Sequence, residues 1–186
     1  MPINIKGNKG DIYLDDRFFR VCESAREKYE SFEFVYRLLR PDELSYLREQ
    51  SAAYKRAVMA VQELIEAPVR KQCPNCVHGT CCRLSSPKLG IYIAQSVGAF
   101  TLTDYLLVRC GGILPAPHFQ NTRRNLCPFW ENGCRLRPDC RSLLCLQYFC
   151  ESLRHELDMD LVNKRIAEVQ AILENFSLNR FFKKSC

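Results

Sequence analysis

The chain has 186 residues, of which 47% are apolar and 26% are charged. This composition excludes a disordered or fibrous class, and the length predicts one domain, residues 1–186, that buries a hydrophobic core of its own. The formal charge of +6 counts every cysteine as neutral, so thiolates on a metal would offset much of it, and the basic character is no evidence for nucleic-acid binding.

The first residues lack the features of a signal peptide, and no stretch approaches the run of about 18 apolar residues that a membrane-spanning helix needs. We therefore expect a cytoplasmic protein with no membrane span. Thiols stay reduced in that compartment, so grouped cysteines are expected to be metal ligands rather than disulfides.

Two apolar stripes at helical spacing predict N-terminal helices within residues 12–68. The first stripe, over residues 15–39, consists of Phe18, Cys22, Ala25, Tyr29, Phe32, Tyr36 and Leu39. The second helix is expected to begin at Pro41 and to bury Leu44, Leu47, Ser51, Tyr54, Val58, Val61 and Ile65. Pro68 is expected to end it, because proline lacks a backbone donor and clashes with the preceding turn. The very short connection at Arg40 predicts a helical hairpin or one sharply bent element.

Ten of the twelve cysteines lie between residues 73 and 150: nine of them form two clusters, and Cys110 lies in the cysteine-poor insert that separates the clusters. A C-x-x-C pair brings two thiolates onto one ion across a tight turn, and four such sulfurs complete a tetrahedral zinc site or the corners of an iron-sulfur cluster. We therefore expect a metal-binding module over residues 73–150. Its predicted metal ligands are Cys73, Cys76, Cys81, Cys82, Cys127, Cys134, Cys140 and Cys145.

The remaining cysteines are expected to lie outside the metal set. Isolated cysteines usually behave as small buried hydrophobes, and this is the expectation for Cys22, Cys110 and Cys186. Cys150 is undecided, because five residues along a helix turn a side chain by about 140° away from Cys145. His78 could complete a Cys3His site, but the surrounding cysteines favour a role behind the ligands or at the surface.

The nearly pure sulfur ligand set favours zinc or iron-sulfur over magnesium or calcium. Neighbouring side chains diverge by about 100° in a helix and about 180° in a strand, so Cys81 and Cys82 do not readily chelate one small ion. This pair slightly favours an iron-sulfur cluster over zinc as the cofactor. The second cluster is expected to close on the first, since a closed site needs four ligands. Three arginines between the cysteines of the second cluster would stabilise thiolates, namely Arg135, Arg137 and Arg141.

The insert between the clusters carries its own signals. Residues 89–93 resemble a short strand. Thr101 and Asp104 have the spacing of a capping box that opens a short helix, which the glycines at 111 and 112 end. The prolines within residues 113–119 predict a loop.

Residues 142–155 and 160–176 are predicted to be helices, and residues 151–178 are expected to form the C-terminal helix. The stripe of the last helix consists of Leu161, Val162, Ile166, Val169, Ile172, Leu173 and Phe176. The expected fold is therefore mainly α: a helical scaffold, made of an N-terminal helical hairpin and a C-terminal helix, around an irregular cysteine-rich metal-binding module.

The cysteine pattern resembles a known family. An opening C-x-x-C is followed by an adjacent Cys-Cys pair, then Cys127-Pro128-Phe129, Cys134 and Arg137-Pro138-x-Cys140-Arg141. Over residues 73–145 this is similar to the YkgJ/FliB-type family of cysteine-rich zinc- or iron-chelating domains. The second half matches closely, whereas four residues rather than about two precede the Cys-Cys pair. In that family a threonine-led helix lies between the clusters, which implies a structural role for Cys110.

The predicted function is that of a metal-binding protein, acting as a redox or accessory module. One longer branch of the resembled family methylates lysine side chains of flagellin with S-adenosylmethionine, which implies a protein lysine N-methylase as an alternative. The chain has no glycine-rich turn after a strand to bind that cofactor. A zinc-ribbon-like nucleic-acid or protein interaction module is the other alternative, although a coherent basic and aromatic stripe is missing. The sequence leaves a protein partner open and argues against nucleic acid.

Overall fold

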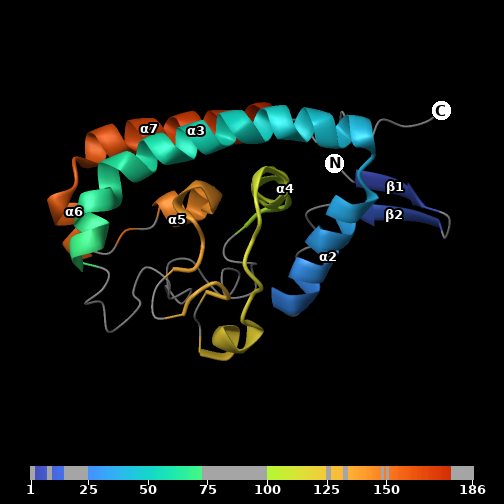
Figure 1. Ribbon diagram of the computed structural model, residues 1–186, viewed down its shortest axis with the longest axis horizontal. Helices are drawn as coiled ribbons and strands as arrows, with labels where there is room; N and C mark the ends of the chain where they lie inside the picture. The colour runs from blue at the N-terminus through green and yellow to red at the C-terminus, as the bar shows by residue number, and fades with distance from the viewer. Residues whose placement is uncertain are drawn as a thin grey trace.

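The computed structural model describes residues 3–7, 10–14, 25–72, 100–124, 127–131, 134–147, 149 and 151–176. Within these ranges the protein is mainly helical, as predicted, with six α-helices, two short 3-10 helices and one two-stranded hairpin (Figure 1). The predicted strand at residues 89–93 lies outside the described ranges. None of the described helices has the length and apolar character needed to cross a membrane.

Helix α3, Pro41–Gln72, is the element on which most of the others pack. It begins at Pro41 as predicted, and the Glu43 carboxylate accepts a hydrogen bond of 2.7 Å from the backbone N–H of Arg40. Six of the seven residues in its predicted stripe are buried; Leu44 is half-buried. The prediction that Pro68 ends the helix is wrong. The helix continues one further turn because Val69 packs on the core and two side chains of that turn, Lys71 and Gln72, bind Glu156.

Helix α2, Ala25–Leu38, buries Ala25 and Phe32 of the first predicted stripe, whereas Tyr29 and Tyr36 are half-buried. It also buries Val35, which the predicted stripe did not include. The part of that stripe before Ala25, with Cys22, falls outside the described residues. Figure 1 shows α2 diverging from the start of α3, so the sharply bent alternative is correct and the two helices do not lie side by side as a hairpin. Instead α2 packs on α4 and on the 3-10 helix η3, Phe119–Arg124.

Helix α4, Leu102–Gly111, confirms the predicted capping box. The Thr101 hydroxyl accepts from the backbone N–H of Asp104 at 3.1 Å, and the Asp104 carboxylate accepts from the Thr101 backbone N–H at 3.3 Å. The helix ends at Gly111, and the loop predicted after it is observed over residues 113–118. Helix α4 lies between α2 and α3 and is buried on most of its surface.

The predicted helix over residues 142–155 is broken. The chain forms α5, Leu143–Gln147, and a separate α6, Glu151–Glu156. The break allows Leu146 to be buried and Phe149 to pack on the core, while α6 turns to meet the C-terminal part of α3. The single C-terminal helix expected over residues 151–178 is also divided, because the chain leaves the helical conformation at residues 157–158, between α6 and the next helix.

Helix α7, Met159–Asn175, lies along α3 as a curved pair, with α4 and α5 on the concave side (Figure 1). Its first turn is capped by Asp158, whose carboxylate accepts from the Leu161 N–H at 3.1 Å. Val162, Ile166 and Val169 are buried as predicted, but the Leu161 side chain is 39% exposed and does not belong to the buried stripe.

The N-terminal hairpin was not predicted. Strands β1, Ile3–Gly7, and β2, Gly10–Leu14, pair in antiparallel register, with Ile3 opposite Leu14 and Gly7 opposite Gly10. The end of β2 lies where residues 12–68 were expected to be helical. The alternating apolar residues of both strands, at the two-residue period of a sheet, are the signal that could have identified it.

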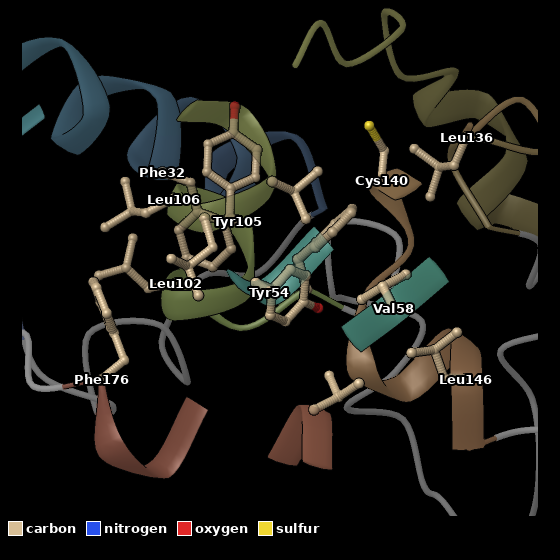
Figure 2. Packing of buried hydrophobic residues seen from close by; sticks show 14 of the residues in the cluster. Phe32, Tyr54, Val58, Leu102, Tyr105, Leu106, Leu136, Cys140, Leu146 and Phe176 are labelled. Carbon is tan, nitrogen blue, oxygen red and sulfur yellow. The ribbon is translucent and has the colours of Figure 1, made fainter. Parts of the chain in front are cut away.

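One hydrophobic core joins the helices. Figure 2 shows the Tyr54 ring near the centre of the labelled side chains, with Tyr105 and Leu106 on one side and Val58 and Leu146 on the other. The core also contains two predicted metal ligands, Cys127 and Cys140. The cysteine-rich chain is therefore part of the same core as α3 and α4.

Candidate metal centre

The structure describes four of the eight predicted ligands: Cys127, Cys134, Cys140 and Cys145. The other four, Cys73, Cys76, Cys81 and Cys82, lie outside the described residues, as do His78, Cys150 and Cys186. Among the residues that are described, no three His, Cys, Asp or Glu side chains gather into a group that could hold a metal ion. Closure of one cluster on the other, as predicted from the sequence, thus depends on residues outside these ranges.

Cys127 begins a tight turn that has the hydrogen bonds expected around a metal-binding sulfur. The backbone N–H of Phe129 points at the Cys127 sulfur, 3.5 Å away, and the N–H of Trp130 donates to the Cys127 carbonyl at 3.0 Å. The Asn121 amide donates to the same carbonyl at 3.2 Å and so fixes the turn from outside. A donor aimed at a sulfur stabilises its thiolate form.

Cys134 lies at the other end of this turn, in an isolated antiparallel bridge with Trp130. The N–H of Arg135 donates to the Phe129 carbonyl at 2.8 Å, which closes the turn. Cys134 is exposed, whereas Cys127 is buried. The turn therefore holds two predicted ligands at its ends, one facing the core and one facing solvent.

Cys140 ends the 3-10 helix η4, Pro138–Cys140, and is fully buried. Its sulfur lies 3.6 Å from the carboxylate of Asp139, which also binds the Lys55 amine at 3.2 Å and the Arg137 guanidinium at 2.9 and 3.0 Å. Burial raises the pKa of the Cys140 thiol, the Asp139 charge raises it further, and Lys55 and Arg137 oppose the rise. Burial would also raise the pKa of Asp139, but Lys55 and Arg137 outweigh it and hold that pKa below its usual range.

Cys145 lies in α5, and Ser142 just before the helix fixes its position. The Ser142 hydroxyl accepts from the Cys145 N–H at 3.3 Å and donates to the Cys145 sulfur at 3.2 Å. Burial raises the pKa of the Cys145 thiol; the Ser142 hydroxyl lowers it, the Cys134 sulfur raises it and the Arg141 charge lowers it. Cys134 and Cys145 are therefore within electrostatic reach of each other, although they belong to different elements.

A buried carboxylate holds α5 against the rest of the fold. One oxygen of Asp104 accepts from the Tyr54 hydroxyl at 2.9 Å and from the backbone N–H of Leu143 at 3.3 Å. The Tyr54 hydroxyl also donates to the Arg141 carbonyl at 3.3 Å. The sequence predicted Tyr54 as a core residue and Asp104 as part of a cap. It did not predict that the two meet and fix the chain that carries Cys140 and Cys145.

Gln62 is a further residue that sequence reasoning missed. It lies on the buried face of α3, four residues after Val58, and its side-chain oxygen accepts from the Arg141 guanidinium at 2.9 Å. A polar residue at a stripe position, i+4 from one buried residue and i−3 from Ile65, is the signal that could have identified it. Sulfur ligands, a backbone N–H directed at one of them and the half-buried guanidinium of Arg141 are donor chemistry of the kind that zinc or an iron-sulfur cluster takes.

Cys110, expected outside the metal set, lies near the end of α4 with its sulfur 3.7 Å from the Leu44 carbonyl. Burial raises the pKa of this thiol, and Arg48 and Arg109 oppose the rise. His118, in the predicted loop, is exposed and lies 2.8 Å from the Arg135 guanidinium.

No protein-family model, no curated protein and no solved structure matches the chain in comparisons with known proteins. The resemblance to the YkgJ/FliB-type family consequently rests on the cysteine motif alone.

Proposed function

We propose that this is a metal-binding protein of a reducing compartment, which holds an iron-sulfur cluster or zinc and acts as a redox or accessory module. The ligands would be the four described cysteines together with Cys73, Cys76, Cys81 and Cys82. The observation that carries the proposal is the turn at Cys127, in which a backbone N–H is aimed at the sulfur of a cysteine that motif spacing alone had selected. Membership of the YkgJ/FliB-type family is part of the same proposal.

The surroundings of the described cysteines support this function. Each of the four lies between residues 127 and 145, on short turns and helices of which η4 and α5 pack on α3, and two of the four belong to the hydrophobic core. Buried thiolates without compensation are costly, and cations or hydrogen-bond donors reduce that cost. Lys55, Arg137 and Arg141 supply positive charge within reach of Cys140 or Cys145. Zinc would cross-link these short elements, whereas an iron-sulfur cluster would add one-electron chemistry.

The test is the metal content of the full chain purified without oxygen. We expect stoichiometric iron with sulfide, or zinc, and for iron an absorption band near about 400 nm that disappears on chelation. Cys127→Ala and Cys145→Ala should each lower the metal content by more than half. The control is the chain with Cys22, Cys110 and Cys186 changed together to Ser, which should keep the wild-type content.

Two results would contradict the proposal. Wild-type protein that holds no metal, after both anaerobic purification and reconstitution, would exclude the function altogether. Loss of metal from the triple control variant, with Cys127→Ala unaffected, would show that the ligand set is wrongly divided. The choice between metals is tested by Cys81→Ser and Cys82→Ser, which should each disturb an iron-sulfur cluster, whereas one of them should be silent in a mononuclear zinc site.

A further inference from the structure

Helix α2 carries two large apolar side chains that the core does not cover. Phe34 is 46% exposed and Leu38 is 39% exposed. They are four residues apart, so they lie one turn apart on the same side of the helix. The buried residues Ala25 and Phe32 lie about 180° and about 200° around the helix from Phe34. The exposed pair therefore points away from the core, and adjoining exposed apolar side chains are typical of a contact with another molecule.

Charged side chains accompany this apolar pair along the helix. Glu27 and Glu30 precede Phe34, Arg37 follows it, and all three charged residues are exposed. At about 100° per residue, the three positions lie within about 60° of Phe34 around the helix axis. We call these five residues, Glu27, Glu30, Phe34, Arg37 and Leu38, the outer face of α2. The outer face is acidic toward the start of the helix and basic toward its end.

We propose that the outer face of α2 is the contact between two copies of this chain, whose α2 helices pack side by side in opposite directions. A two-fold axis at Phe34 places this ring against the partner's Phe34. It also brings Glu30 to within about one residue of the level of the partner's Arg37, on the same flank of the contact. A parallel pair would place like charges together instead. Charges that flank an apolar seam determine the orientation of two helices, so the order of charges selects the antiparallel pair.

The position of α2 leaves its outer face accessible to a partner chain. Figure 1 shows α2 at one side of the molecule, where it diverges from the start of α3, and its main packing partners among the described elements are α4 and η3. Arg37 pairs with Glu33 of its own helix at 3.7 Å, but 75% of the Arg37 side chain remains exposed. Glu33 in turn is bound by Arg109 and Tyr105 of α4. An exposed ion pair of this kind is weak, so Arg37 can turn to the partner's Glu30.

Sedimentation velocity of the full chain tests the proposal. The protein is kept under reductant, because it has 12 cysteines, and its concentration is varied from about 1 μM to about 1 mM. We expect a reversible equilibrium between monomer and dimer, since one helix of 14 residues offers only a small contact area. Phe34→Ser should weaken dimerisation at least about tenfold, because the ring lies at the centre of the contact in both chains. Ile113→Ser removes a side chain that is 83% exposed elsewhere, and this matched control should leave dimerisation unchanged.

A charge swap tests the antiparallel order. At low salt, Glu30→Lys should weaken dimerisation about fivefold to tenfold, because it places two positive charges together at both ends of the contact. Adding Arg37→Glu in the same chain makes the facing charges opposite again, and should return the association to within about twofold of wild type. In a parallel pair, Glu30→Lys would only exchange one pair of like charges for another. The unfolding temperature of each variant is measured to show that the chain remains folded.

The results that would overturn the proposal differ from those that concern metal content. A chain that stays monomeric up to about 1 mM overturns it, and so does a dimer that is insensitive to Phe34→Ser. Leu38→Ser should also weaken dimerisation, and it takes the place of Phe34→Ser if that variant does not fold. If the apolar substitutions weaken the dimer while Glu30→Lys has no effect at low salt, the antiparallel arrangement is wrong and the proposal falls with it.

Discussion

Replacing Asp104 by Ala is expected to destabilise the protein more than any other loss of one helix cap. The carboxylate is almost fully buried and accepts four hydrogen bonds, from the Tyr54 hydroxyl, the Leu143 N–H, and the backbone N–H and hydroxyl of Thr101. Loss of a cap costs about 1 kcal/mol. A buried donor left without its acceptor costs about 1–3 kcal/mol, and the partly buried N–H of Leu143 loses its Asp104 acceptor in this variant.

Together these two contributions give a loss of about 2–4 kcal/mol in the free energy of unfolding for Asp104→Ala. For a chain of this size, each kcal/mol lowers the unfolding temperature by about 2–4 °C, so we expect a decrease of roughly 10 °C. Thermal unfolding followed by circular dichroism at a helix-sensitive wavelength measures it. The control is Asp158→Ala, which removes one exposed cap bond from α7 and should cost only about 1 kcal/mol.

A double-mutant cycle with Tyr54→Phe tests the contact itself. Tyr54→Phe alone should cost about 1 kcal/mol, but in the Asp104→Ala background it should be nearly neutral, because the hydroxyl has already lost its strongest acceptor. Equal losses for Asp104→Ala and Asp158→Ala, or strict additivity in the cycle, would refute the view that Asp104 joins three elements.

Two further predictions concern packing between α4 and its neighbours. Burial would raise the pKa of Glu33, but hydrogen bonds from Arg109 and Tyr105 and the charges of Arg109 and Arg37 lower it below its ordinary value of 4.5. Its stabilisation is therefore complete above that value and is lost as the pH falls through the folded-state pKa. Between pH 6 and pH 3, the unfolding temperature of Glu33→Gln should fall less steeply than that of wild type. An equal fall of the unfolding temperature in both proteins would contradict this prediction. Gly111→Ala should cost about 1–3 kcal/mol, because the added Cβ would overlap the Ser51 hydroxyl of α3. Gly112→Ala, where the Cβ would lie 3.3 Å from the Cys140 sulfur, should cost clearly less, and the reverse order would show that α4 can shift away from α3.

Local signals in the sequence predicted the elements whose determinants are local. The capping box at Thr101, the helix start at Pro41 and the buried stripe of α3 all depend on residues within one or two turns, and all three are observed. The continuation of α3 past Pro68 and the break between α5 and α6 depend instead on contacts with distant elements, which periodicity does not report.

In the candidate site, too, the features set by local sequence could be predicted, whereas those set by contacts between distant residues could not. Cysteine spacing selected Cys127 and Cys134, and the structure brings them to the two ends of one turn. The partners behind the cysteines could not be predicted, because Tyr54 and Asp104 are 50 residues apart in the chain, and Gln62 and Arg141 are 79 residues apart. Tyr54 and Gln62 both belong to α3, and the two pairs form because α3 packs on α4, which carries Asp104, and on η4, which Arg141 follows.

The position of α7 at the end of the described chain has a consequence for how the protein is made. The last predicted ligand, Cys145, is synthesised before Met159, where the helix that covers α3 begins. A ribosome-bound chain would therefore have all the predicted ligands while α3 still presents an apolar surface that residues of α7, among them Val162, Ile166 and Val169, will cover. Chains that terminate between residues 146 and 158 would carry every predicted ligand and yet expose that surface to other chains, so metal supply alone would not keep them from aggregating.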